Sequence, residues 1–112
     1  MQQVMEQIKL DLTELIEEGK TDSISGRTFG EGYAAKVELL ENIKAGNKIT
    51  LIIPPQKIKA INDSFWKGFF SGLFKVYKKK EIIKSFFNFE TDDFYKTLIE
   101  KNLTILDSIS NA

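Results

Sequence analysis

Three runs of apolar residues in this chain have the pattern of β-strands. Alternating apolar and polar positions predict a strand over about residues 6 to 13, although a helical stripe over residues 4 to 18 also fits. The continuous apolar run in residues 48 to 54 predicts a core strand that is covered on both faces and ends at two prolines. A β-branched and aromatic run predicts a further strand over residues 81 to 89.

Apolar residues at helical spacing separate these runs. Thr28 and Glu31 have the spacing of a capping box, which predicts a helix over roughly residues 29 to 45 that stops at Gly46. The residues before this helix, 19 to 26, are rich in glycine and serine and therefore predict a turn.

Two further helices have clear start signals. One runs from Ser64 to about Tyr77 and carries apolar residues on more than half of its circumference, so it needs more than one covering surface. The last opens at Thr91, which can cap it, and its apolar stripe continues to Ile109. Strands and helices thus alternate, which predicts an α/β fold: a mixed sheet of about four strands with helices packed against it.

The size and composition of the chain fit one small globular domain. At 112 residues we expect residues 1 to 112 to form a single fold. Hydrophobic residues make up 42% and charged residues 29%, and no apolar run approaches the roughly 20 residues of a membrane span. The amino terminus lacks the pattern of a secretory signal and the chain has no cysteine, so a reducing cytoplasm is the expected location.

The types of residue present argue against catalysis. Histidine and cysteine are both absent, which removes the commonest ligands of zinc, haem and iron–sulfur clusters and the usual general base for a nucleophile. The 16 carboxylates are spread along helix faces and turns instead of converging on one pair of loops. We therefore expect a non-enzymatic protein without a metal or a cofactor.

Charge is unevenly distributed although the net charge is zero. Residues 1 to 47 carry five basic and nine acidic side chains, whereas residues 48 to 89 carry nine basic and two acidic. Most of this basic excess comes from Lys75, Lys78, Lys79, Lys80 and Lys84. A basic middle third predicts either a solvated edge or a surface that attracts an acidic protein or a polyanion.

Three segments of the chain share a pattern with a known family. They are Ser25-Gly26-Arg27-Thr28 to Gly32, the apolar strand Ile49 to Ile53, and Ile61-Asn-Asp-Ser-Phe65 running into a helix with Ser71-Gly72 two turns on. On these segments the chain resembles the STAS-like family of small bacterial proteins, relatives of the anti-sigma factor antagonists. The resemblance covers roughly residues 6 to 107 and implies a STAS-like domain.

The resemblance also implies a regulatory site. In the antagonist family a serine or threonine beside an aspartate at this loop-to-helix junction is phosphorylated by a partner kinase, and the matching residue here is Ser64. The implied partner is a histidine-kinase-like ATPase, an anti-sigma factor or a sensor kinase. It would dock on Asn62, Asp63, Ser64, Trp66 and Lys67, with Trp66 as an anchor and Lys67 as a steering charge. A purely structural role is the alternative, because Asn62, Asp63 and Ser64 can each cap a helix.

Two other functions compete with this interpretation. A phage or mobile-element inhibitor would use the same scaffold to block a host enzyme through its basic, aromatic middle. A nucleic-acid-binding accessory protein would stack bases on Trp66 and its neighbouring aromatics, with lysines along the backbone. Helical spacing instead places these aromatics where they pack against the sheet, so nucleic acid is not the expected partner. A homodimer is a further alternative.

Overall fold

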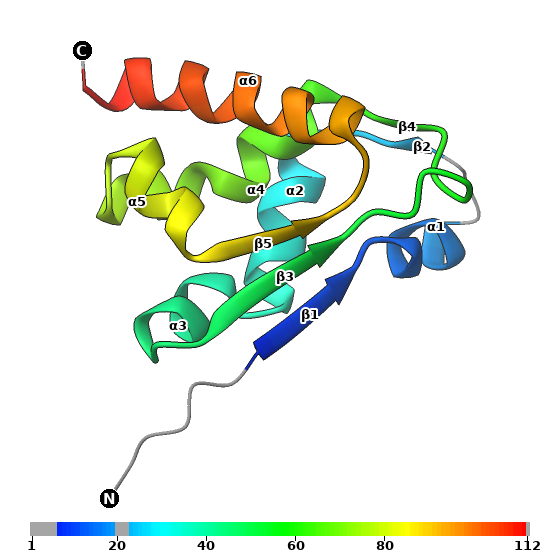
Figure 1. Cartoon of the computed structure of the whole chain (residues 1–112), viewed down its shortest axis with the longest axis horizontal. Helices are drawn as coiled ribbons and strands as arrows, with labels where there is room; N and C mark the ends of the chain where they lie inside the picture. The colour runs from blue at the N-terminus through cyan, green and yellow to red at the C-terminus, as the bar shows by residue number, and fades with distance from the viewer. Residues whose placement is uncertain (1–6, 20–22, 112) are drawn as a thin grey trace, which may run out of the picture.

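A three-stranded parallel sheet forms one layer of the structure. The computed structural model describes residues 7–19 and 23–111 (Figure 1). Strands β1 (Gln7–Asp11), β3 (Lys48–Ile52) and β5 (Phe87–Glu90) lie in the order β1-β3-β5, and both pairings are parallel. The short strands β2 (Ser23–Ile24) and β4 (Ala60–Ile61) form a second parallel pair. The predicted α/β class is confirmed, but a mixed sheet of about four strands is not.

Helices fill the connections between these strands. Within the described residues they are α1 (Thr13–Gly19), α2 (Arg27–Lys36), α3 (Leu39–Lys44), α4 (Asp63–Val76), α5 (Lys80–Ser85) and α6 (Asp93–Ser110). Strand β1 confirms the first predicted strand, and α1 follows it where the alternative helical stripe continues. Residue 6 of that strand and residues 20 to 22 of the predicted turn lie outside the described residues.

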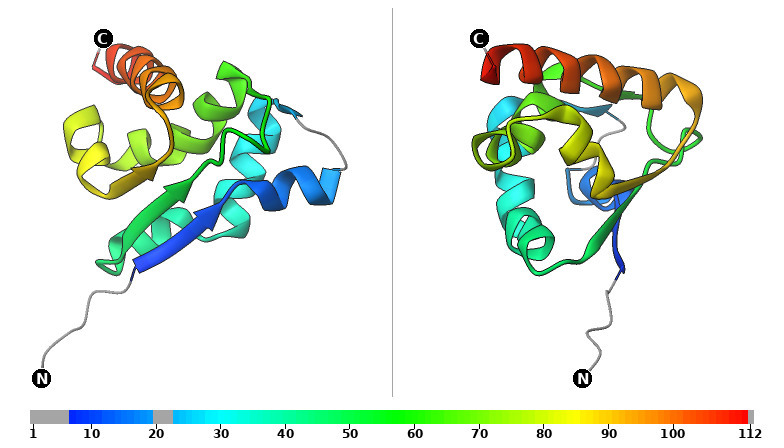
Figure 2. Two further views of the ribbon diagram at one scale, coloured as in Figure 1. Left: turned by 45° about the vertical axis from the view of Figure 1, so that its right-hand side comes forward. Right: turned by 60° about the vertical axis from the view of Figure 1, so that its left-hand side comes forward.

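Helices cover one face of the three-stranded sheet. Helices α2 and α4 lie on one side of the sheet (Figure 2). The alternate residues Ile49, Leu51 and Ile53 are buried at 1% exposure or less, and Phe87, the register partner of Ile49, meets Phe69 and Phe70 of α4. On the other face Thr50 is flanked in register by Lys9 and Asn88, which are both exposed. The prediction that this strand is covered on both faces is therefore wrong. Thr50 itself is nevertheless buried at 2% exposure.

Helix α4 is the core of the molecule. Its buried residues are Phe65, Trp66, Gly68, Phe69, Phe70, Leu73 and Phe74. Tyr33 of α2 stacks on the ring of Phe69 at 5.9 Å, and Phe87 of β5 meets Phe70 edge-on at 5.5 Å. The helix is enclosed by α2 and α6, and by the sheet through Phe87, as its wide apolar surface predicts. Aromatic burial on this scale is the main source of stability in a domain of this size.

The predicted helix over residues 29 to 45 is two helices. Helix α2 ends at Lys36, and Glu38 adopts a left-handed conformation with φ 52° before α3 begins at Leu39. Because of this break, the side chains of Leu39 and Ile43 are buried in the core. The start of the predicted helix is also wrong, since α2 begins at Arg27 with Gly26 as its N-cap and no side-chain capping bond. Gly46 follows α3 in the left-handed conformation, as predicted.

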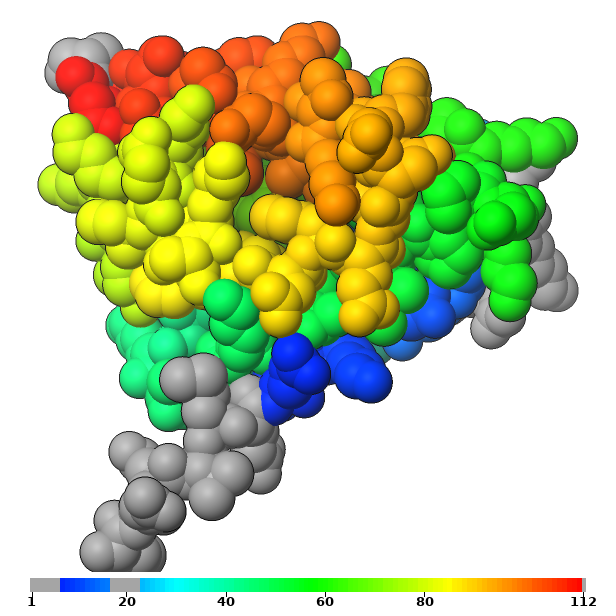
Figure 3. Space-filling view, in the orientation of Figure 1, coloured from blue at the N-terminus to red at the C-terminus, as the bar shows by residue number. Residues whose placement is uncertain are grey.

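The predicted strand over residues 81 to 89 is correct only in its second half. Residues 80 to 85 form α5, which packs against α6 in the upper part of the face shown in Figure 3. The backbone N–H of Lys80 donates to Asp107 Oδ1 at 2.9 Å, and Lys84 Nζ donates to Glu100 Oε1 at 2.8 Å. These bonds to α6 override the β-propensity of the local sequence.

The start of α6 differs by one residue from the prediction. Asp92 is the N-cap and accepts a hydrogen bond from the backbone N–H of Tyr95 at 3.0 Å. Thr91, which was the predicted cap, instead donates from its hydroxyl to the backbone carbonyl of Ile53 at 2.9 Å. Thr91 therefore links the end of β3 to the chain that enters α6.

Two glycines allow the backbones of α2 and α4 to touch. A Cβ at Gly30 would lie 2.2 Å from the carbonyl oxygen of Phe65, and a Cβ at Gly68 would lie 2.0 Å from the carbonyl oxygen of Arg27. Both distances are well inside van der Waals contact with atoms that cannot move independently of the helices. Any other residue at either position would push the two helices apart.

We predict that Gly30→Ala destabilises the fold by about 3 kcal/mol or more, because the added methyl group overpacks a backbone contact. Gly32→Ala is the matched control, since it lies in the same helix with open space around the site of a Cβ. That control should be neutral or stabilising by up to about 1 kcal/mol, because alanine favours helix. Urea unfolding of the two variants measures both effects, and equal midpoints would refute the contact.

Candidate partner-binding site at the start of helix α4

The predicted junction at residues 62 to 67 lies at the start of a helix, as expected. Asn62 is the N-cap of α4, and its Oδ1 accepts hydrogen bonds from the backbone N–H of Ser64 at 2.9 Å and from the Ser64 hydroxyl at 3.0 Å. Asn62 is exposed and Ser64 is half-buried. Of the three capping candidates in the sequence, Asn62 performs the capping.

Ser64 also connects α4 to the start of α2. Its Oγ accepts a hydrogen bond from the backbone N–H of Gly26 at 3.0 Å, across 38 positions of sequence. The preceding strands pair in parallel, and the backbone N–H of Asn62 donates to the carbonyl oxygen of Ile24 at 2.7 Å. The two helices therefore begin side by side, with the Ser64 hydroxyl between them.

Asp63 interacts with α6 and does not lie free beside Ser64. Its Oδ1 accepts from the side-chain amide of Asn102 at 3.0 Å, and its Oδ2 lies 3.2 Å from Lys101 Nζ. The hydrogen bond from Asn102, together with Lys101 and the more distant Lys67, lowers the pKa of the Asp63 carboxyl. The carboxylate of Asp63 therefore already has its partners inside the domain, on α6.

Trp66 is not a surface anchor. Its exposure is 0%, and its ring lies 5.2 Å from that of Phe65 and 5.9 Å from that of Phe70. The partner-binding role predicted for Trp66 is therefore wrong, because α4 is enclosed on that side. Lys67, the next residue, is half-buried and remains at the surface edge of the site.

Burial also removes most of the aromatic surface of α4 that was considered for nucleic-acid binding. Phe69, Phe70 and Phe74 are each at most 3% exposed, so their faces cannot stack on bases. Two of the basic residues, Lys80 and Lys84, contact α6 through Thr104 and Glu100. The remaining lysines of this region, Lys75, Lys78 and Lys79, are exposed.

Phe29 is a surface residue that the sequence analysis did not select. It is 45% exposed in the first turn of α2, and its ring centroid lies 6.1 Å from that of Phe65. The only feature of the sequence that could have indicated Phe29 as a site residue is its position inside the segment from Gly26 to Gly32. Phe29 places an apolar group beside the paired helix starts, where Trp66 was expected to provide one.

Neither a metal site nor a membrane-spanning helix is present in the described part of the chain. Within residues 7–19 and 23–111, no group of three or more acidic side chains is placed to hold a metal ion. No helix in that part of the chain is long and apolar enough to cross a bilayer. No family model, curated protein or solved structure matches the chain. The STAS-like assignment therefore stays a prediction from the segments described above.

We predict that Asp63 stabilises the fold in a pH-dependent manner. Because its folded-state pKa is lowered, the contribution is complete above the unfolded value of 3.8 and is lost as the pH falls through the folded-state pKa. Wild type should therefore exceed Asp63→Asn in stability at neutral pH, and the difference should shrink below pH 3.8. Urea midpoints of both proteins across this range test the effect. A difference that does not change with pH would contradict it.

Proposed function

We propose that this domain is a non-catalytic protein-interaction module in bacterial regulation, resembling an anti-sigma factor antagonist. Its partner would be a histidine-kinase-like ATPase, an anti-sigma factor or a sensor kinase, as the resemblance implies. The observation that carries the proposal is the Ser64 hydroxyl, which joins the starts of α2 and α4 at the surface. The proposed setting is the cytoplasm.

The proposed contact surface consists of Asn62, Ser64 and Lys67 of α4 with Phe29 of α2. Phe29 contributes an exposed aromatic side chain, a type that is enriched at protein interfaces. Asn62 and Lys67 supply polar and charged groups at its edge. Asp63 belongs to this surface only at its rim, since its carboxylate is held by α6.

Ser64 is the proposed switch. A phosphate there would add about two negative charges beside the N-termini of two helices, whose dipoles favour an anion. The N–H of Gly26 already donates to the Ser64 oxygen, so the domain has a donor in place for the added charge. A partner that packs an apolar surface against Phe29 would instead meet an unpaired charge. Modification would therefore release the partner without unfolding the domain.

Affinity capture with charge variants tests this proposal. Wild-type protein should retain a discrete protein partner, identified by mass spectrometry, and Ser64→Asp should weaken that binding by roughly tenfold or more. Ser108→Asp is the matched control, because Ser108 is exposed in the last turns of α6 and should bind as wild type. Equal retention by the two variants, or no retained partner for wild type, would contradict the proposal.

Salt dependence of the captured complex separates the classes of partner. Binding centred on Phe29 should change little between low and moderate salt, whereas binding to a polyanion through the exposed lysines should fall steeply as counterions are released. A steep loss of affinity with salt would favour a nucleic acid over the protein partner proposed here.

A further inference from the structure

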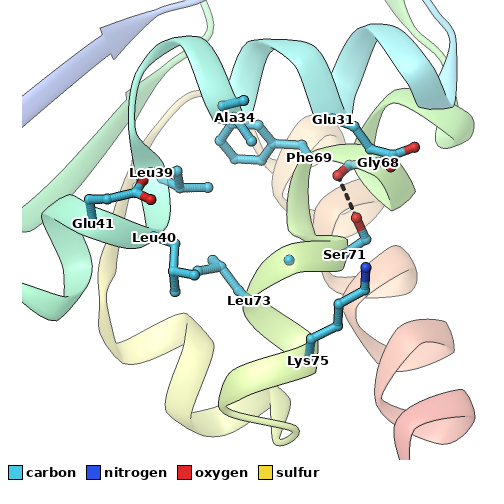
Figure 4. Close-up of a pocket in the computed structure, with 12 residues that line it drawn as sticks. Glu31, Ala34, Leu39, Leu40, Glu41, Gly68, Phe69, Ser71, Leu73 and Lys75 are labelled. Carbon is cyan, nitrogen blue, oxygen red and sulfur yellow. Dashed lines mark hydrogen bonds between the residues drawn. The ribbon is translucent and has the colours of Figure 1, made fainter.

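A second surface feature lies away from Ser64, in the groove between α2, α3 and α4 (Figure 4). This open groove has a volume of about 250 Å³. Apolar and small residues form its floor and walls: Ala34, Ala35, Leu39, Leu40, Gly68, Phe69, Gly72 and Leu73. The one hydroxyl among its lining residues, on Ser71, already donates to the carbonyl oxygen of Gly68 at 2.9 Å. The groove thus offers apolar contact and no unsatisfied hydroxyl.

Packing inside the described part of the domain does not require a glycine at position 72. It is exposed in the interior of α4, and a Cβ there would have nothing within 4 Å. Gly68, one turn earlier, differs because the backbone of α2 lies against it. A glycine in an exposed helix destabilises that helix relative to alanine. Close approach by the backbone of another molecule would account for Gly72.

The charges at the rim of the groove have opposite signs on its two sides. Glu31 and Glu41 lie on the α2–α3 side, and Lys75 lies on the α4 side, extending along the helix toward Ser71 (Figure 4). Val76, which follows Gly72 by one turn on the same helix face, is 45% exposed. Within the described part of the chain, Glu31 pairs with Arg27 at 4.0 Å in a solvent-exposed contact, which holds it weakly.

We propose that this groove binds a second copy of the chain in a two-fold symmetric dimer. A two-fold axis near Gly72 brings the two α4 helices together antiparallel at the position without a side chain. It also places Lys75 of each copy opposite Glu31 of the other, and Val76 over the partner's groove. A different partner whose helix carried charges of one sign only would be repelled, either by the acidic rim on the α2–α3 side or by Lys75 on the α4 side. The proposal does not depend on the function proposed for Ser64.

Charge reversal tests the dimer directly. Sedimentation equilibrium over a wide range of concentration should show wild type in a monomer–dimer equilibrium. Lys75→Glu and Glu31→Lys should each raise the dissociation constant by about tenfold or more, since like charges then face one another. The double variant should recover most of the loss. Lys57→Glu, an exposed lysine in the loop after β3, is the control and should dimerise as wild type.

Gly72→Ala provides a second test whose two readouts move in opposite directions. The variant should raise the thermal midpoint of the dilute monomer, because alanine favours helix, and should weaken dimerisation, because the added methyl group separates the α4 helices. A wild-type chain that stays monomeric at every concentration would overturn the proposal. So would a dimer that neither Gly72→Ala nor the charge variants affect. Ser64→Asp should leave the dimer intact, which keeps this test separate from the partner-binding test.

Discussion

The direct backbone contact between α2 and α4 determines where the candidate site lies and what it can do. Gly30 and Gly68 bring the helices closer than any side chain would allow, so their N-termini emerge together beside the paired strands β2 and β4. The same approach places the Ser64 hydroxyl within hydrogen-bond distance of Gly26. The helix contact at the two glycines in the core thereby determines that the two helix starts lie side by side at the surface.

Local sequence signals were sufficient where one strong pattern controlled the outcome. The apolar run of β3 and the long apolar surface of α4 are both placed correctly, and so is the left-handed glycine after α3. The start of α4 could be predicted because Asn62, Asp63 and Ser64 are all residues that favour the first turn of a helix. The position of Ser64 at the surface edge followed from the same signal.

Features that depend on contacts distant in sequence could not be predicted. Glu38 is left-handed although glutamate rarely adopts that conformation, so no local signal marks the break between α2 and α3. Residues 80 to 85 have a strand-like composition, but Asp107 and Glu100 of α6 hold them as a helix. Trp66 was expected to be a surface anchor because the sequence alone does not reveal that α2, α6 and the sheet together enclose α4.

The close approach of α2 and α4 at Gly30 and Gly68 places the Ser64 hydroxyl against the Gly26 amide, and amide hydrogen exchange at Gly26 tests this arrangement most directly. In wild type the Gly26 amide should exchange slowly, because it donates to Ser64 Oγ. In Ser64→Ala that protection should be lost at Gly26, while the Gly30 amide, which donates to the Gly26 carbonyl, stays protected. A Gly26 amide that exchanges at the unprotected rate in wild type, or equally slowly in both proteins, would contradict the account.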